Sequence, residues 1–235
     1  MSRGAYLLEL GLVPYREAWD LQRSLAGAVS QGAIPETVIF LEHPPVVTLG
    51  RRTDEGELHV PEDAEVDVVE TDRGGKSTFH GPGQLVCYPI LDLRLHGKDV
   101  KKYVRDLEEA LIRTLAPFGI EGIRFDGLTG VWLHRPPRKI ASIGVHISRW
   151  ITTHGYALNV DLDPAPFTQW ITACGLDAAF TTIAGELGRP VRVEEVRPHA
   201  RDAIAEVFGL ELDALPADDG AGLWRQPIHA QLAAR

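Results

Sequence analysis

Residues 130–160, GVWLHRPPRKIASIGVHISRWITTHGYALNV, carry the pattern that decides the expected fold. Three segments of this stretch are rich in β-branched and aromatic residues, which favour extended backbone: GVWLH (130–134), RKIASIGVHI (138–147) and THGYALNV (153–160). Consecutive strands of this kind are typical of an α+β fold, whereas strict alternation of strands and helices indicates a doubly wound sheet.

The rest of the chain extends the pattern. Further strands are expected over residues 5–10, 37–42, 46–50, 65–72 and 84–93. Apolar residues spaced by three and four predict helices over 15–30 and 99–116, and another helix is expected over 199–208. We therefore expect one domain over residues 1–235, a mixed β-sheet flanked by helices that pack mainly on one face. A tail rich in Asp, Ala and Gly, loosely ordered from about residue 213, should follow.

Composition excludes several classes of protein. Hydrophobic residues make up 44% of the 235 residues and charged residues 24%, as in ordinary globular proteins. No apolar run reaches the ~20 residues of a membrane-spanning helix, and no secretory signal is expected. The net charge of −9 disfavours nucleic-acid binding. Two cysteines are too few for a disulfide framework, so we expect a reducing, cytoplasmic location.

The segment RGGKSTFHGPGQ (73–84) contains four glycines, which let a ligand approach the backbone closely. It lacks the GxxxxGK[ST] spacing of a nucleotide-binding loop. Arg73 and His80 lie at either end of its central part and could orient a substrate carbonyl or shape the mouth of a pocket. A plain turn between two strands is the alternative interpretation.

The two cysteines differ in their surroundings. Cys87 lies in the apolar strand LVCYPI, where a thiol usually acts as a small hydrophobic side chain. Cys174 is followed by a glycine and lies outside any strong strand or helix pattern, which favours a functional thiol about as much as a structural one.

Lys139 begins a strand whose later residues are small or apolar, so its side chain could point into a sheltered cleft. An edge-strand lysine that prevents aggregation is the alternative, and the residues alone favour it. His80, His134, His146 and His154 lack metal-ligand spacing, so no metal is expected.

Taken together, these segments resemble the lipoyl(octanoyl) transferase family. The resemblance runs from His43 to about Arg197, and four motifs carry it: RGGKSTFHGPGQLVCYP (73–89), GVWLHRPPRKIASIGVHISRW (130–150), THGYALNV (153–160) and ACGL (173–176). That family shares its fold with lipoate- and biotin-protein ligases. It usually has a proline before the catalytic cysteine, where this chain has Ala173.

The resemblance implies a Cys/Lys dyad, in which Cys174 carries the acyl group and Lys139 is its partner. It also implies a substrate-binding set: Arg73, Gly74, Gly75, Lys76, Ser77, Thr78, Phe79, His80, Ser142, Ile143, Gly144, Gly155, Tyr156 and Ala157. The implied reaction belongs to lipoate biosynthesis and moves an octanoyl group from octanoyl-acyl carrier protein to a lysine. The implied acceptors are lipoyl domains of 2-oxoacid dehydrogenase complexes and the glycine cleavage H protein. The protein is expected to be a monomer and to need no cofactor.

The chemistry explains why a lysine should accompany the cysteine. A thiol with an ordinary pKa of ~8.5 is only a few per cent thiolate at neutral pH. An ammonium ~4 Å away favours the anion by roughly 4 kcal/mol before desolvation. We further hypothesise that Lys139 later takes a proton from the incoming lysine ammonium.

Three other functions are compatible with parts of the pattern. An ATP-dependent lipoate or biotin ligase would share the fold and a glycine-rich loop but would need a nucleotide. A cysteine hydrolase would use Cys174 with His80 or His154 and release free acid. A non-catalytic acyl-binding protein would keep its function when Cys174 is replaced.

Overall fold

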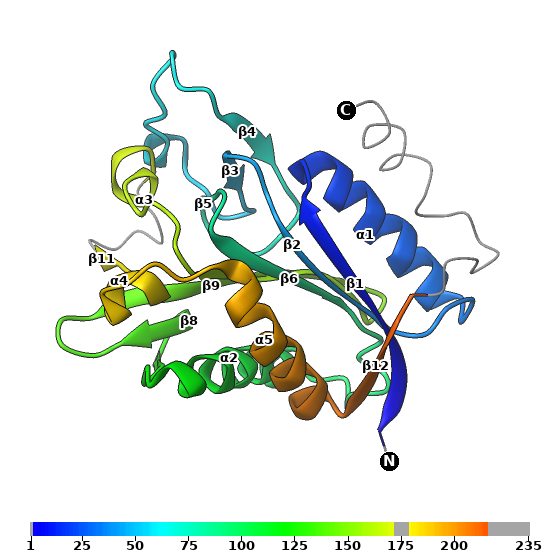
Figure 1. Ribbon diagram of the computed structural model, residues 1–235. Coiled ribbons are helices and arrows are strands. Elements are labelled where there is room, and N and C mark those ends of the chain that lie inside the picture. The colour runs from blue at the N-terminus through cyan, green and yellow to red at the C-terminus, as the bar shows by residue number, and fades with distance from the viewer. Residues whose placement is uncertain (1, 172–178, 216–235) are drawn as a thin grey trace.

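The computed structural model describes residues 2–171 and 179–215 (Figure 1). Its helices are α1 (Tyr15–Ser30), α2 (Val100–Leu115), α3 (Pro166–Gln169), α4 (Ile183–Leu187) and α5 (Val193–Phe208), with 3₁₀ turns at Glu55–Glu57 and Ala116–Phe118. The strands are β1 (Arg3–Leu12), β2 (Thr37–Glu42), β3 (Val46–Leu49), β4 (Asp67–Glu70), β5 (Thr78–His80), β6 (Gln84–Ile90), β7 (Ile123–Phe125), β8 (Leu128–Leu133), β9 (Arg138–Ser148), β10 (Ile151–Asn159), β11 (Ala179–Phe180) and β12 (Leu210–Ala214). None of these helices is long and apolar enough to cross a membrane.

The described strands form one large mixed sheet and one small sheet. The large sheet has the order β12-β1-β2-β6-β10-β9-β8-β7, and β11 pairs with β9. Its pairs from β2–β6 through β8–β7 are antiparallel, while β1 pairs in parallel with both β2 and β12. The small sheet, β4-β3-β5, lies at the top of Figure 1. The mixed sheet expected from the sequence is confirmed.

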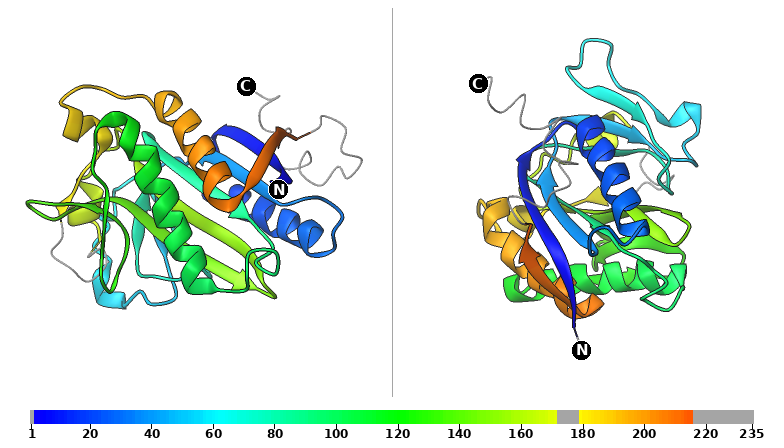
Figure 2. Two further views of the ribbon diagram at one scale, coloured as in Figure 1. Left: turned by 90° about the horizontal axis from the view of Figure 1, so that it is seen from below. Right: turned by 90° about the vertical axis from the view of Figure 1, so that its right-hand side faces the viewer.

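Alternate residues of the central strands pack on opposite faces of the large sheet, because successive side chains of a strand point in opposite directions. Val38 and Phe40 of β2 belong to the core beneath α2 and α5. Ile39 and Leu41 belong to a second core with the buried face of α1. Helices therefore cover both faces, with α2 and α5 on one side and α1 on the other (Figure 2). The expectation that they pack mainly on one face missed α1.

Two expectations near the C-terminal end of the described chain are also corrected. The helix predicted over 199–208 begins earlier, at Val193. Pro198 lies inside this helix, α5, and does not break it. The tail expected to be loose from about residue 213 starts within a strand, since Asp213 and Ala214 belong to β12 and pair with β1. Residues from 216 onward lie outside the described part of the chain.

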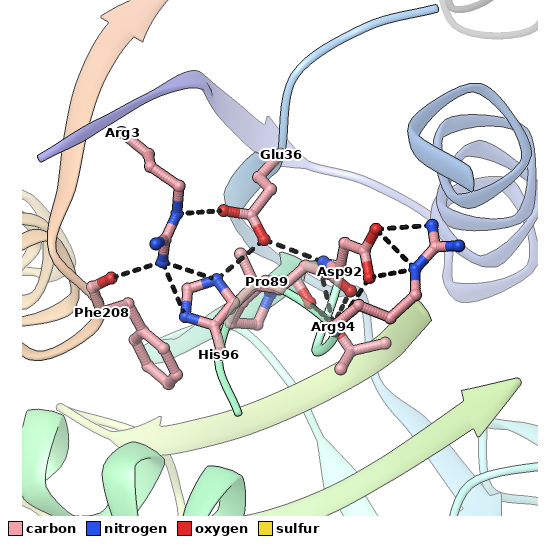
Figure 3. Close-up of polar contacts among 9 residues, drawn as sticks. Arg3, Glu36, Pro89, Asp92, Arg94, His96 and Phe208 are labelled. Atoms are coloured by element: carbon pink, nitrogen blue, oxygen red, sulfur yellow. Dashed lines mark hydrogen bonds and ion pairs between the residues drawn. The ribbon is translucent and has the colours of Figure 1, made fainter. Parts of the chain in front are cut away.

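A buried polar cluster ties the start of β1 to distant segments (Figure 3). Glu36 Oε1 accepts hydrogen bonds from the Asp92 backbone N–H and from His96 Nε2, both at 2.8 Å. Arg3 donates to His96 Nδ1 at 3.0 Å and to the carbonyl of Phe208 at 3.4 Å. The Arg3 Nε and Glu36 Oε2 atoms form an ion pair at 3.6 Å. One buried carboxylate thus links β1, the loop after β6 and the end of α5.

We expect Glu36→Ala to lower the free energy of unfolding by about 1–3 kcal/mol, because it leaves buried donors of Asp92 and His96 without their acceptor. Urea denaturation measures the change. Asp20→Ala is the matched control, since Asp20 pairs with Arg23 on the exposed surface of α1 and should contribute less than about 1 kcal/mol. Equal urea midpoints for the two variants would show that the Glu36 cluster is not stabilising.

Candidate active site

A cavity of about 390 Å³ lies where the glycine-rich segment meets the large sheet. Its walls come from residues 73–78 and His80, from β9 and β10, from the first residue of α1, and from the loop and strand at 127–132. The predicted substrate-binding residues that line it are Arg73, Gly74, Gly75, Lys76, Ser77, Thr78, His80, Ser142, Ile143, Gly144, Gly155, Tyr156 and Ala157. Lys139 lines it as well. The structure thus brings together three segments that are far apart in sequence.

Phe79 is the predicted substrate-binding residue that the structure places elsewhere. Within β5, its neighbours Thr78 and His80 line the cavity, and Phe79 points to the opposite face because side chains alternate along a strand. Its ring packs at 5.9 Å from Phe167 and at 5.6 Å from Trp170 in a separate hydrophobic cluster. Its position is that of a core residue supporting the loop.

Arg73 holds the glycine-rich loop in shape. Its guanidinium donates to the Thr48 carbonyl and hydroxyl at 2.7 Å, to the Lys76 carbonyl at 2.8 Å and to the Gly74 carbonyl at 3.1 Å. Gly75 adopts a positive φ of 92°, which favours glycine. A Cβ on Gly50 would lie 2.5 Å from the Gly75 carbonyl oxygen, so this neighbouring glycine is also required. The side chain that the sequence suggested as an orienting group for substrate is largely engaged with the protein itself.

Lys139 is buried in the wall of the cavity, with 4% of its surface exposed. Its Nζ lies 5.2 Å from the centre of the Trp132 ring. β9 lies between β8 and β10 in the sheet, so the alternative of an edge-strand lysine is wrong. Gly130 of β8 makes room for this side chain, because a Cβ there would lie 2.9 Å from Lys139 Cε.

Cys174 lies outside the described residues, which stop at Ile171 and resume at Ala179. The chain resumes beside Lys139, because Phe180 of β11 pairs with Lys139 and the Thr181 N–H donates to the Lys139 carbonyl at 3.0 Å. Phe180 also lines the cavity. Cys87 is fully buried in the main core, and burial raises the pKa of its thiol. The interpretation of Cys87 as a core residue is confirmed.

The sequence reasoning missed a group of polar and aromatic residues on the wall near α1. Tyr15, Tyr88 and His154 line the cavity there. Asp72 is not a lining residue, but its side chain contacts the His154 ring. His154 Nε2 is 2.7 Å from Asp72 Oδ1, and its Nδ1 is 3.3 Å from the Tyr15 hydroxyl. No motif spacing could have found this group, because its members come from α1, β6, β10 and the loop after β4.

Burial keeps the histidines of this wall neutral at pH 7. It lowers the pKa of His43 to about 4 and that of His80 well below its usual value. The pKa of His154 is also lowered, mainly by burial, although the Asp72 carboxylate acts in the opposite direction. Among the described residues, no three His, Cys, Asp or Glu side chains are arranged to hold a metal ion.

A sequence profile of the lipoyl protein ligase A/B catalytic domain matches residues 14–205. The chain belongs to this family. Within the lipoyl protein ligase A/B family, it is 48% identical over 232 residues to an octanoyltransferase of Mycobacterium ulcerans, with 94% of each chain covered. It is 51% identical over 225 residues to an octanoyltransferase of Mycobacterium tuberculosis, covering 94% of this chain and 91% of that one.

Solved structures of the same fold are more distant in sequence. A bi-partite lipoate protein ligase from the lipoylation system of Thermoplasma acidophilum superposes with a TM-score of 0.77 at 17% identity, covering 95% of this chain and 91% of that one. A lipoate-protein ligase A bound with ATP gives a TM-score of 0.76 at 16% identity, with 96% and 94% covered. These likenesses establish the ligase-like fold that the resemblance implied.

Proposed function

We propose that this chain is an octanoyltransferase of lipoate biosynthesis that works in the cytoplasm as a monomer. It would take an octanoyl group from octanoyl-acyl carrier protein, hold it as a thioester on Cys174, and pass it to a lysine of a lipoyl domain. The acceptors would be lipoyl domains of 2-oxoacid dehydrogenase complexes and the glycine cleavage H protein. Relatives about 50% identical over nearly the whole chain carry the name octanoyltransferase.

The observation that carries the proposal is the buried lysine beside an acyl-sized cavity. Lys139 is inside the cavity wall, where a positive charge acts through a medium less polarisable than water. Apolar side chains of Trp132, Ile143 and Phe180 line the same space and suit a hydrocarbon chain. Each buried methylene contributes about 0.8 kcal/mol to binding, so the cavity favours a medium-length acyl group over a short one.

The reaction follows from these parts. The ammonium of Lys139 would favour the thiolate of Cys174, which attacks the donor thioester and releases the carrier thiol. One thioester replaces another, so this step needs no ATP. An amine then attacks the enzyme-bound thioester, and the amide that forms is more stable than the thioester it replaces.

The test is transfer without ATP. Purified protein is mixed with octanoyl-acyl carrier protein and an apo lipoyl domain, with and without ATP and Mg²⁺, and intact masses are recorded. We expect octanoylation of the domain in both mixtures, together with an octanoyl adduct on the enzyme that alkaline hydroxylamine removes. Transfer only with ATP, or only in a third mixture in which free octanoate and ATP replace octanoyl-acyl carrier protein, would indicate a ligase. Release of free octanoate without transfer would indicate a hydrolase.

A further inference from the structure

The cavity has an open end and a closed end. Thr129, which lines it, is exposed, and the next residue is Gly130, where a Cβ would lie 2.9 Å from Lys139 Cε. At the other end, Tyr15 and His154 line the cavity with only 5% and 1% of their surfaces exposed. The opening is therefore beside Lys139, and the closed end is beside Tyr15 and His154.

The sheet register places these two ends far apart. Lys139 and Val145 both belong to β9, and Val145 pairs with His154 of β10. Six residues of a strand span about 20 Å, because each residue advances the backbone by ~3.3 Å. Ile143 and Val145 line the cavity between its ends. A ligand that enters beside Lys139 therefore runs along apolar side chains of β9 toward His154.

An acyl group attached beside Lys139 has one direction in which to extend. Its thioester is near the opening, because the carrier protein stays outside the cavity, so its hydrocarbon tail points to the closed end. Carbon–carbon bonds of ~1.5 Å advance an extended chain by ~1.3 Å each, so an octanoyl group spans roughly 9 Å. The side chains at both ends occupy part of the remaining distance. The tail of a medium-length acyl group therefore comes close to the closed end.

The ring of Tyr15 closes this end and is packed on several sides. The ring centres of His43, His80 and His154 lie 5.1, 5.8 and 6.4 Å from that of Tyr15. The rings of His80 and His154 are stacked with it. Close-packed interiors resist added volume, because neighbouring side chains must leave their preferred positions. The Tyr15 ring cannot move aside without displacing these rings.

Hydrogen bonds hold the Tyr15 hydroxyl as well. It lies 3.3 Å from His154 Nδ1, and it also forms hydrogen bonds with the side chains of Arg73 and Thr71. His154 is held in turn, since its Nε2 lies 2.7 Å from Asp72 Oδ1. Movement of the ring would leave these buried groups without partners, which is unfavourable. The closed end is thus a rigid wall.

The backbone of His154 joins this wall to α1. Its φ is +56°, which is uncommon for a residue other than glycine and is maintained only where the surrounding structure enforces it. Its N–H donates to Gln22 Oε1 at 2.6 Å, and Gln22 is fully buried. Because Tyr15 and Gln22 belong to the same helix, α1 is fixed against β10 through both the side chain and the backbone of His154.

The rings of the wall are uncharged at pH 7. Burial lowers the pKa of His43 to about 4, lowers those of His80 and His154, and raises that of Tyr15 to about 12. Both ring nitrogens of His43 and of His154 are engaged with protein groups. Neutral polar groups that are already paired do not require a polar ligand, so this wall is compatible with the methyl end of an acyl chain.

We propose that Tyr15, held in place by His154, sets the longest acyl group that the enzyme transfers. This inference rests on the proposed function and adds a specificity-determining residue to it. Each methylene that finds room in the cavity increases binding about fourfold. A methylene that meets the wall gains nothing and must displace packed rings. Octanoyl should therefore be transferred better than dodecanoyl.

The test uses donors that differ only in acyl length. The kcat/KM for transfer is measured with octanoyl-, decanoyl- and dodecanoyl-acyl carrier protein. Tyr15→Ala removes the ring and makes room for at least two further methylenes, so we expect its ratio of dodecanoyl to octanoyl kcat/KM to exceed that of the wild type by at least about tenfold. Tyr15→Phe keeps the ring and should keep the wild-type ratio within a few-fold.

Leu21→Ala is the matched control. Leu21 is buried on α1 in the second core and is not among the residues that line the cavity. Its replacement loosens the same helix without enlarging the cavity, so its ratio should equal that of the wild type. Tyr15→Leu keeps more apolar volume than Tyr15→Ala and is the second variant if the alanine protein does not fold. Its ratio of decanoyl to octanoyl should rise.

An unchanged ratio in folded Tyr15→Ala or Tyr15→Leu protein would overturn the proposal, and so would an equal increase in Leu21→Ala. Calorimetric binding of free octanoate and dodecanoate makes the same comparison without any reaction. A wild type that binds these acids but transfers no acyl group would overturn the proposed function. The affinities of the variants would still decide whether Tyr15 limits the length of the chain.

Discussion

Cys174→Ala should lower the rate of octanoyl transfer by at least about 10³-fold, because removal of a covalent nucleophile leaves only binding and positioning to accelerate the reaction. The enzyme-bound octanoyl adduct should disappear at the same time. Steady-state transfer to an apo lipoyl domain measures the first effect and intact mass the second. An adduct of undiminished yield on this variant would place the acyl group on another residue.

Cys87→Ala is the matched control for this experiment. Cys87 is fully buried on β6 in the main core and is not among the residues that line the cavity. Its replacement should leave transfer within a few-fold of the wild type and lower the free energy of unfolding by about 1 kcal/mol. The two variants together separate loss of the nucleophile from loss of a thiol. Comparable activity in both would return Cys174 to a structural role.

Lys139→Met should slow acyl-enzyme formation by about 10²-fold at pH 7, since methionine fills a similar volume without the charge. The deficit should shrink as pH rises through ~8.5, where a thiol ionises without help. Rapid-quench measurement of the first half-reaction from pH 6.5 to 9.5 tests both the size and the sign of this dependence.

Lys139→Arg is the companion variant, because it keeps a positive charge at the same position on β9. It should form the acyl-enzyme faster than Lys139→Met at pH 7. Thermal unfolding of both variants is needed as well, because Lys139 packs near Trp132 and its replacement also changes the core. An Lys139→Met enzyme with wild-type rates at every pH would show that the thiolate needs no help from this side chain.

The central strands were predictable because their side chains are buried on both faces of the sheet and are therefore apolar or β-branched along most of each strand. The segments 130–134, 138–147 and 153–160 match β8, β9 and β10 closely, since β-branched and apolar side chains on these strands are buried by helices and neighbouring strands. The turn between β9 and β10 gave no such signal. Arg149 and Trp150 both have positive φ there, a conformation that hairpins usually assign to Asn and Gly.

Half of the candidate site was predictable in the same way, and half was not. The glycine-rich loop and the small residues of β9 and β10 are required by close backbone contacts. At Gly155, for example, any added Cβ would lie 2.2 Å from the Cys87 carbonyl oxygen. The polar residues on the cavity wall near α1 have no such local requirement that the sequence could show. Tyr15 begins an ordinary amphipathic helix and Asp72 follows an exposed strand, and only the sheet order brings both to His154.

The pairing of β1 with β12 has a consequence for how the chain reaches its native state. Arg3 pairs with Leu210 and Leu7 with Ala214, so the strand synthesised first among those described completes its ladder with the last. Contacts of such large sequence separation form slowly, because a long loop must close before they contribute. During translation one edge of β1 therefore stays unpaired until β12 has left the ribosome. Over that interval the nascent chain presents an open sheet edge, the feature on which aggregation and chaperone capture act.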